Sequence, residues 1–394
     1  MIKIDNKTKC TGCSACYNAC PISCIQMKTD EEGFFYPVAK AELCIGCGKC
    51  EKVCPLLNEP KLENKTRKVY VCQNRSLEIR RDSTSGGVFS GLAQYVLDRN
   101  GIVFGAEFDD KFSVKHGSVD TVDDLWRFRG SKYVQSWTGE SFKTVQNELN
   151  KDRWVLFSGT PCQVAGLNAF LGRHYEKLIL MDIVCYSISS PGIWQQFLDK
   201  IGQKIHLNEV KSIKFRDKTK YGYEYSLMTF CNKDGKVLYA DGPESNQMLR
   251  SFVSNTSTRP SCYDCKFKTV DRVSDFTAWD CYNIYQYDKK MDDNQGTSHL
   301  MVHTEKGLAI LKEVQKYIYL LEVDADKAIK SEPAMTECAR PSDMRDAFFT
   351  TYEKGENVFE SYFRDTGRVR IERILRNILS KVGLYKYVKR LMKG

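Results

Sequence analysis

Along residues 69–345 the apolar positions form two kinds of pattern, short runs typical of strands and longer stretches typical of helices. Short apolar runs bounded by polar or glycine-containing segments predict strands. These strands are expected at 102–108 (IVFGAEF), 112–119 (FSVKHGSV), 154–159 (WVLFSG) and 178–185 (LILMDIVC), with the first two forming a pair. The intervening stretches at 138–150 and 161–172 predict helices. This alternation predicts an α/β or α+β domain built on a mixed sheet.

A second group of patterns follows further along the chain. Residues 223–240 predict a β-hairpin around the turn Asn232-Lys233-Asp234-Gly235, and residues 304–318 have the periodicity of a helix. Residues 58–68 (NEPKLENKTRK) are polar, charged and interrupted by a proline, which is typical of a linker between two hydrophobic cores. A new domain is therefore expected to start near Val69.

The C-terminal stretch 368–393 is amphipathic and basic. Its apolar residues fall on a helical stripe, at Ile371, Ile374, Leu375, Ile378, Leu379, Val382 and Tyr385. Its positive charge comes from Arg370, Arg373, Arg376, Lys381, Lys386, Lys389 and Arg390. Such a helix can lie on an anionic membrane surface, or its stripe can pack on the body of the protein or on a partner. Gly383 is expected to divide it into two short helices.

Two similar cysteine-rich stretches precede the linker, CTGCSACYNACP at 10–21 and CIGCGKCEKVCP at 44–55. Each reads Cys-x2-Cys-x2-Cys-x3-Cys-Pro, the spacing of bacterial two-cluster 4Fe-4S ferredoxins, in which the fourth cysteine ligates the other cluster. The sequence therefore assigns Cys10, Cys13, Cys16 and Cys54 to one cluster, and Cys44, Cys47, Cys50 and Cys20 to a second.

Zinc and disulfide bonds are the alternatives for these cysteines. Structural zinc takes four ligands, commonly as two pairs, and has no use for the third cysteine of each stretch. Disulfides need an oxidising compartment, whereas Met1 runs into the first motif without the apolar leader of an exported chain. We therefore expect iron–sulfur clusters in a cytoplasmic protein.

Length and charge add further limits. The chain has 394 residues, so a large domain follows the ferredoxin motif, and no apolar run approaches the ~20 residues of a membrane span. The net charge is +9, but residues 364–394 contain ten lysines and arginines against two acidic residues, and nucleic-acid binding is not expected. The expected division is a ferredoxin domain at 1–57, a linker at 58–68, a catalytic domain at 69–345 and a basic helical tail at 346–394.

Four further cysteines stand where they could hold a third cluster. Cys162 follows one predicted strand, Cys185 ends the next, and Cys262 and Cys265 form a Cys-x-x-Cys pair in RPSCYDCKF. Thiolates from distant positions are common ligands of buried iron–sulfur clusters. Cysteine is also among the residue types most often buried, so Cys162 and Cys185 could equally be packing residues. Spacing alone leaves both interpretations open.

Two polar stretches are candidates for ligand binding. DSTSGGVFSG offers hydroxyl groups as helix N-caps and two glycines that let the backbone approach a ligand, so its helix start could accept a phosphate. RGSKYVQS brings a hydroxyl, a cation and an aromatic ring together. Both stretches are also typical of ordinary caps and turns. The residues concerned are Ser83, Thr84, Ser85, Gly86 and Gly87 in the first stretch and Ser131, Lys132 and Tyr133 in the second.

Taken in order, these motifs resemble a known family. The ferredoxin motif followed by STSGGV, GSKYVQS, GTPCQVAGL, DIVCYSISSPG and RPSCYDCKFKTVDRVSDFTAWD is similar to the beta subunit of coenzyme F420 hydrogenase/dehydrogenase and its relatives, over about residues 5–290. The resemblance implies an iron–sulfur flavoprotein that binds FAD. It also implies a third 4Fe-4S cluster on Cys162, Cys185, Cys262 and Cys265, and FAD contacts from Ser83–Gly87, Ser131–Tyr133, Thr160, Pro161 and Gln163.

The resemblance does not fix the electron acceptor. The chain departs from the family pattern at Asp280-Cys281-Tyr282-Asn283, which makes Cys281 an alternative cluster ligand. The leading hypothesis is an oxidoreductase that passes electrons from ferredoxin or another low-potential donor through 4Fe-4S clusters to FAD and an organic acceptor. If the tail contacts a membrane, a lipid-linked saccharide of envelope polysaccharide synthesis is one candidate acceptor. The alternatives are a non-catalytic electron-input subunit and an enzyme of coenzyme F420 itself.

Overall fold

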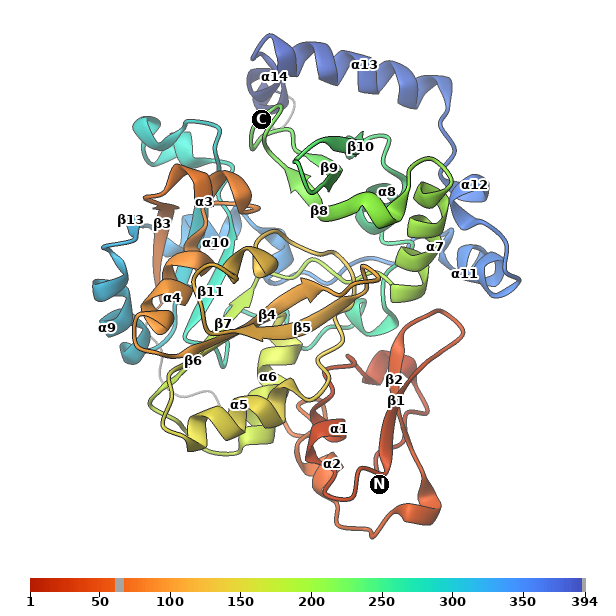
Figure 1. The fold of residues 1–394 in the computed structure, drawn as a ribbon, viewed down its shortest axis with the longest axis vertical. Coiled ribbons are helices and arrows are strands. Elements are labelled where there is room, and N and C mark those ends of the chain that lie inside the picture. The colour runs from red at the N-terminus through yellow and green to blue at the C-terminus, as the bar shows by residue number, and fades with distance from the viewer. Residues whose placement is uncertain (61–66, 392–394) are drawn as a thin grey trace.

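The computed structural model describes residues 1–60 and 67–391, whose strands form three sheets (Figure 1). The strands are β1 Ile25–Thr29, β2 Phe35–Ala39, β3 Lys68–Asn74, β4 Ile102–Phe108, β5 Val114–Val119, β6 Val155–Gly159, β7 Leu178–Ile183, β8 Val210–Asp217, β9 Leu227–Asn232, β10 Val237–Asp241, β11 Phe276–Asp280, β12 Ser298–Val302 and β13 Ile318–Val323. The α-helices are α1 Ala15–Ala19, α2 Lys49–Lys52, α3 Leu77–Asp82, α4 Val88–Leu97, α5 Ser141–Asn150, α6 Pro161–Leu171, α7 Pro191–Gly202, α8 Gln247–Val253, α9 Glu305–Val314, α10 Ala325–Lys330, α11 Arg345–Glu353, α12 Val358–Tyr362, α13 Gly367–Lys381 and α14 Tyr385–Leu391.

The largest sheet is mixed. Its strand order within the described residues is β13-β3-β12-β11-β7-β6-β4-β5. The four central strands β11, β7, β6 and β4 are parallel, and antiparallel strands extend the sheet on both sides. The mixed α+β character predicted from the sequence is confirmed. Because the central strands run the same way, their carboxyl ends meet at one edge, which is where open sheets of this kind bind ligands.

Most of the predicted elements are present. β4 and β5 form the expected antiparallel pair, and β9 and β10 form the expected hairpin. The helix predicted at 304–318 was too long: α9 ends at Val314, and Ile318 begins strand β13. The backbone of Ile318 pairs with Asn74 of β3, and its side chain is buried, so strand pairing prevails over local helical periodicity.

Helices cover both faces of the large sheet. Alternate residues of β4 and β6 point to opposite faces. Val103 and Leu156 pack with residues of α4 and α9, whereas Phe104 and Phe157 pack with residues of α5 and α6. This sandwich holds the carboxyl ends of the parallel strands in fixed positions.

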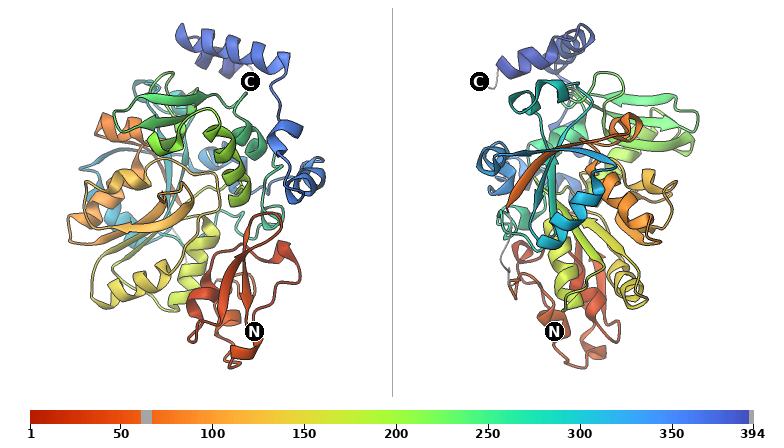
Figure 2. Two further views of the ribbon diagram at one scale, coloured as in Figure 1. Left: turned by 45° about the vertical axis from the view of Figure 1, so that its right-hand side comes forward. Right: turned by 90° about the vertical axis from the view of Figure 1, so that its left-hand side faces the viewer.

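A separate aromatic core joins distant parts of the chain. Phe34 and Tyr36 of the N-terminal hairpin pack in the same cluster as Trp194 of α7, Phe230 of β9 and Phe349 of α11. The N-terminal segment is therefore fixed to the body by shared hydrophobic packing. In the views of Figures 1 and 2 the N-terminal segment and helices α13 and α14 lie at opposite ends of the molecule.

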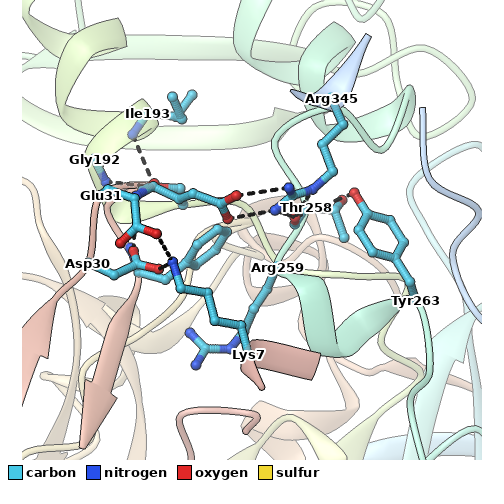
Figure 3. A network of polar contacts seen from close by, with 12 residues as sticks. Lys7, Asp30, Glu31, Gly192, Ile193, Thr258, Arg259, Tyr263 and Arg345 are labelled. Carbon is cyan, nitrogen blue, oxygen red and sulfur yellow. Dashed lines mark hydrogen bonds and ion pairs between the residues drawn. The ribbon is translucent and has the colours of Figure 1, made fainter. Parts of the chain in front are cut away.

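The turn between β1 and β2 docks onto the body through polar contacts (Figure 3). Arg345 of α11 donates to both carboxylate oxygens of Glu32, at 2.8 and 2.6 Å. Gly33 has φ +80°, and a Cβ there would lie 2.8 Å from the Cα of Gly192. Residues 61–66, which make up most of the predicted linker at 58–68, lie outside the described residues. Within the described part of the chain, no helix has both the length and the apolar composition needed to cross a bilayer.

Candidate functional site

The four cysteines proposed for a third cluster line one small cavity. Cys162 lies in the first turn of α6 and Cys185 lies just beyond β7, so adjacent parallel strands deliver both to the same edge of the sheet. The loop after α8 brings Cys262 and Cys265 to the same cavity. The cavity has a volume of about 30 Å³, and we call it the cysteine cavity. Tertiary structure thus unites thiols that the sequence separates widely.

The lining of the cysteine cavity suits an anionic cluster. Three cationic side chains, those of Arg259, Lys268 and Arg272, line it beside the four thiols. Arg272 is buried, and its Nε and one of its terminal nitrogens have no hydrogen-bond partner. Burial raises the pKa of Cys262 to about 12, so a thiolate there needs a strong positive charge such as iron. The donor set therefore fits a 4Fe-4S cluster, which carries net negative charge with four thiolates.

The ferredoxin cysteines gather as the motif predicts. The second set, Cys20, Cys44, Cys47 and Cys50, lines a cavity of about 20 Å³. In the first set, burial raises the pKa of Cys10, Cys13 and Cys16, and the nearby Cys54 thiol raises it further in all three. Across residues 1–60 and 67–391 no group of three or more His, Cys, Asp or Glu is arranged around a single metal ion.

The first ferredoxin set lies directly against the cysteine cavity. Thr11, which follows Cys10 directly, lines that cavity together with Cys162. Helix α6 reaches the ferredoxin segment at Gly166, where an added Cβ would lie 2.9 Å from Sγ of Cys13. The two sets of thiols are thus neighbours across the junction between the ferredoxin segment and the body.

Arg259 occupies this junction and is fully buried. Its Nε donates to the carbonyl of Cys10 at 3.0 Å, and a terminal nitrogen lies 3.9 Å from Sγ of Cys10. Its guanidinium also stacks on the ring of Tyr36, 4.0 Å from the centroid, and lines the cysteine cavity. One cation therefore faces both cysteine sets.

A larger cavity opens along the carboxyl edge of the sheet. Its volume is about 380 Å³, within the range of ligand pockets. Thr11, Cys162 and Cys185 line both this large cavity and the cysteine cavity. A ligand in the large cavity would consequently adjoin the thiols of the cysteine cavity.

Most residues expected to contact FAD line the large cavity. These are Ser83, Thr84, Ser85, Gly87, Ser131, Lys132, Tyr133, Thr160 and Gln163. Gly86 and Pro161 do not line it. Gly86 packs against the backbone of neighbouring strands, where an added Cβ would lie 2.4 Å from the carbonyl oxygen of Cys72. Pro161 instead lines the cysteine cavity.

The prediction that a serine or threonine at 83–85 caps the following helix was wrong. Helix α4 begins after Gly87, which has φ +77° and provides no side-chain cap. Ser83 is instead the C-cap of α3, and its hydroxyl donates to the carbonyl of Ile79 at 2.7 Å. Two helices therefore meet at this segment, and the positive φ that separates them requires glycine. The amino end of α4 still opens onto the large cavity, through Gly87 and Val88.

A hydrogen-bonded network that the sequence did not reveal forms part of the cavity wall. The Gln163 amide accepts from the Thr160 backbone N–H at 3.0 Å and donates to the Ser136 hydroxyl at 2.9 Å. The Ser136 hydroxyl also lies 3.1 Å from Nδ1 of His116. Burial lowers the pKa of His116 to about 4, so this imidazole is neutral at pH 7. A lone histidine in a strand carried no signal of this role.

Two buried charges border the cavity. Burial lowers the pKa of Lys132 to about 8, and its Nζ donates to three backbone carbonyls of its own loop at 3.2–3.3 Å. Asp280, at the end of β11, forms an ion pair with Arg216 and accepts from the Tyr223 hydroxyl at 2.8 Å. Arg216 also contacts the hydroxyl of Tyr282. Asp280 of the segment 280–283 therefore lines the large cavity, and Tyr282 is linked to it through Arg216.

The structure also shows where three other cysteines lie relative to the proposed cluster sites. Cys281 is buried against Val71 and Ile284 and does not line the cysteine cavity, so its alternative role as a ligand has no support from the geometry. Cys338 lies beside Cys265, whose backbone N–H donates to its sulfur at 3.3 Å. Cys24 lines the second ferredoxin cavity, and its Sγ lies 3.4 Å from that of Cys20.

Comparison with known families agrees with this arrangement. Residues 152–328 match the family of the C terminus of the coenzyme F420 hydrogenase/dehydrogenase beta subunit, and residues 9–56 match the 4Fe-4S dicluster domain. Residues 152–328 are therefore similar to the C-terminal domain of that beta subunit family. The resemblance inferred from the motifs is confirmed, and the N-terminal segment is a 4Fe-4S dicluster domain. The protein is therefore an iron–sulfur redox protein related to hydrogenase and dehydrogenase subunits.

Other comparisons are more distant. A chain of the F420-reducing [NiFe] hydrogenase complex from Methanosarcina barkeri, studied by xenon derivatization, is 16% identical with a TM-score of 0.44. The alignment covers 76% of this chain and 92% of that chain. No curated protein matches the sequence.

Proposed function

We propose that this protein is an iron–sulfur flavoprotein oxidoreductase that passes electrons from a low-potential donor, such as ferredoxin, to an organic two-electron acceptor. The single observation that carries this proposal is the contact between cavities. The cysteine cavity and the large cavity share Thr11, Cys162 and Cys185, and the dicluster domain adjoins the cysteine cavity on its other side. Cofactors held in these places would form a continuous series through one chain.

The large cavity is the proposed FAD site. Flavin supplies the conversion between single electrons and the electron pair that an organic acceptor requires. Lys132 offers a cation at the cavity wall, and the amino end of α4 offers backbone N–H donors, both suited to a diphosphate. The neutral His116 is hydrogen-bonded through Ser136 to Gln163, which keeps the wall after β6 rigid and free of added charge.

The size of the cavity favours an enzyme over an electron-input subunit. A subunit that only relays electrons needs an exposed docking face, whereas a cavity of about 380 Å³ lined by hydroxyl, cationic and aromatic side chains suits a bound organic molecule. Coenzyme F420 is a second candidate acceptor, because the related hydrogenase and dehydrogenase subunits are named for it.

A lipid-linked saccharide of envelope polysaccharide synthesis is a further candidate acceptor, with the protein at the cytoplasmic face of the membrane. The observation that favours it is the row of exposed apolar side chains on α13, including Ile374 and Ile378, which are 57% and 53% exposed. Deletion of residues 368–394 should abolish activity on a lipid-linked acceptor while preserving reduction of a small soluble dye. Equal activity of the truncated and full-length proteins on the lipid-linked acceptor would refute this assignment.

The first test is anaerobic purification with iron, sulfide and flavin measured on the same sample. Three clusters and one flavin predict about twelve irons, twelve sulfides and one FAD per chain. The variant Cys262→Ala should retain only about eight irons, because the dicluster domain keeps its own ligands. Cys281→Ala is the matched control, a buried cysteine outside the cysteine cavity, and should retain about twelve irons. About eight irons and no flavin in the native protein would overturn the proposal.

A further inference from the structure

Helix α13 presents its apolar stripe to solvent. The exposed fractions are 61% for Ile371, 57% for Ile374, 55% for Leu375, 53% for Ile378 and 60% for Val382. The helix lies along one end of the molecule, beyond the sheet formed by β8, β9 and β10 (Figures 1 and 2). Within the part of the chain that the structure describes, α13 contains no buried residue.

The opposite, polar face of α13 is held against the body. Arg376 lies 3.7 Å from the carboxylate of Glu244, and Arg373 lies 3.9 Å from that of Asp241. A surface helix of a soluble protein normally buries its apolar face and exposes its polar face. The orientation of α13 is therefore the reverse of the usual one, and its ion pairs maintain that orientation.

Helix α14 continues the same surface. Its Lys389 forms an ion pair with Glu224 at 3.1 Å, and the ring of Tyr385 lies 5.0 Å from that of Tyr225. Leu384, which precedes α14, and Leu391, which ends it, are 51% and 84% exposed. The two helices thus form one exposed apolar surface, which we call the tail surface. Polar contacts on the opposite side of the helices hold it to the body.

Positive charge borders the tail surface. With 100° between successive residues, Arg370 and Lys381 fall along one edge of the stripe and Arg368 falls along the other, and all three are exposed. Residues 364–394 contain ten basic residues against two acidic ones. A convex apolar stripe with a basic border matches the interface of a bilayer rich in anionic lipid, where apolar side chains enter the acyl boundary and basic ones meet the headgroups.

We propose that the tail surface binds the anionic lipid surface of a membrane, with α13 lying in the plane of the interface. The dicluster domain then lies at the end of the molecule farthest from the membrane. A soluble donor could reach it there. This binding needs neither the clusters nor the flavin. It goes beyond the proposed redox function, and its failure would remove only the lipid-linked acceptor from the candidates.

The tail surface also connects to the large cavity. Nζ of Lys389 lies 4.6 Å from the ring centroid of Tyr282, whose hydroxyl contacts Arg216, and Arg216 pairs with Asp280 of the cavity wall. A membrane-bound tail would therefore hold this side of the cavity toward the lipid. If the proposed oxidoreductase function is correct, that orientation favours an acceptor that is itself carried by lipid.

The test is co-sedimentation of the full-length, anaerobically purified protein with vesicles. We expect binding to vesicles of phosphatidylcholine mixed with phosphatidylglycerol, and little to phosphatidylcholine alone. The double variant I374D/I378D removes apolar contact and adds negative charge, so its affinity should fall at least about tenfold. Neutralising the border with R368Q/R370Q/K381Q should reduce affinity to a similar degree, and molar salt should weaken binding by the native protein.

The matched control is V253D, because Val253 is 60% exposed on the body, outside the tail surface. Its affinity for vesicles should equal that of the native chain, and cluster absorbance should show that every variant is folded. Absence of binding to anionic vesicles would overturn the proposal, as would unchanged binding by I374D/I378D. A dimer in solution that I374D/I378D dissociates, without vesicle binding, would assign the tail surface to a second copy of the chain instead.

Discussion

At the scale of single residues, Arg259 has the most consequential position. The guanidinium is buried between the first ferredoxin set and the cysteine cavity, and it bonds to the carbonyl of Cys10. A buried positive charge stabilises the reduced, more negative state of a nearby cluster. Arg259 is thereby suited to raise the reduction potential of the first ferredoxin cluster and of the cluster proposed for the cysteine cavity.

Substitution of Arg259 tests this electrostatic role. Arg259→Gln should lower the potential of the first ferredoxin cluster by on the order of 60 mV, a tenfold change in a one-electron equilibrium. Redox titration followed by electron paramagnetic resonance measures it. Lys9→Gln is the control, because Lys9 is exposed and water screens its charge. Equal potentials in Arg259→Gln and native protein, at equal iron content, would contradict the role.

Two buried histidines predict sensitivity to acid. Burial lowers the pKa of His116 and His299 to about 4 each, below the value of 6.5 in an unfolded chain. Because the unfolded state binds more protons in this range, the stabilisation is fully present above pH 6.5 and is lost as pH falls toward 4. Each histidine accounts for up to about 3 kcal/mol of the free energy of unfolding.

Anaerobic urea denaturation at pH 7 and pH 5, followed by tryptophan fluorescence, measures this loss. In His116→Gln the loss between the two pH values should be smaller by about 2 kcal/mol, because the unfolded chain no longer gains a proton at position 116. His174→Gln is the control, since that side chain is 69% exposed. If His116→Gln and the native protein lose stability equally, His116 is not buried in the neutral form.

At the scale of elements, helix α6 links the sheet to the dicluster domain. It begins directly after β6 with a capping box formed by Thr160 and Gln163, and its first turn carries Cys162. One turn later, Gly166 packs against Cys13. A single helix therefore positions Cys162 of the cysteine cavity and the surface against which Cys13 of the first ferredoxin set packs.

The packing at Gly166 is tight enough to be tested with one methyl group. Gly166→Ala should destabilise the protein by about 1–3 kcal/mol, since the new Cβ overpacks against Cys13, and should lower the midpoint of anaerobic urea unfolding. Gly202→Ala is the control, because that Cβ meets only the flexible side chain of Leu207, at 3.2 Å. There the higher helix propensity of alanine should leave stability unchanged or slightly raised. A neutral Gly166→Ala would mean that α1 and α6 are not in close contact.

The orientation of helix α13 depends on residues far away in the chain. Its hydrophobic stripe was evident from the sequence, whereas the direction in which the stripe points depends on Asp241 and Glu244, which lie far away in the chain. These carboxylates lie under the polar face and leave the apolar face outside. The ion pairs are individually weak, but together they set the orientation of the helix.

At the scale of the whole molecule, the dicluster domain and the body behave as one structure. Phe34 and Tyr36 share the aromatic core of the body, and Glu32 forms a two-bonded ion pair with Arg345, with side-chain exposures of 13% and 11%. Such a partly buried pair fixes the geometry of docking, because either partner left alone is a buried charge.

A double-mutant cycle across this contact tests the docking. Glu32→Gln and Arg345→Met should each lower the free energy of unfolding by about 3 kcal/mol, because each leaves an unpaired charge. The double variant should cost about the same as either single one, which demonstrates coupling. Anaerobic urea denaturation monitored by cluster absorbance gives all four values. Strictly additive effects would show that Glu32 and Arg345 act independently, and Lys3→Gln, on the exposed Lys3–Asp5 pair, serves as control.

The sequence by itself determined those features that depend on local spacing or period. The Cys-x2-Cys-x2-Cys-x3-Cys-Pro repeats fix the dicluster domain, because a short loop must present its thiols at set intervals. The apolar runs that became β4, β6 and β7 predicted the buried sheet, because residues of a strand alternate between its faces. The turn of the β9–β10 hairpin was predictable for the same local reason.

Only the tertiary structure decided what depends on distant parts of the chain. The order of parallel strands brings Cys162 and Cys185 together, and a later loop brings Cys262 and Cys265 to them. Ile318 became a strand because β3 was available to pair with it. The start of α4 was set by the left-handed backbone of Gly87, not by a serine cap. Spacing along a chain specifies local contacts, whereas contacts across the fold depend on which surfaces packing brings together.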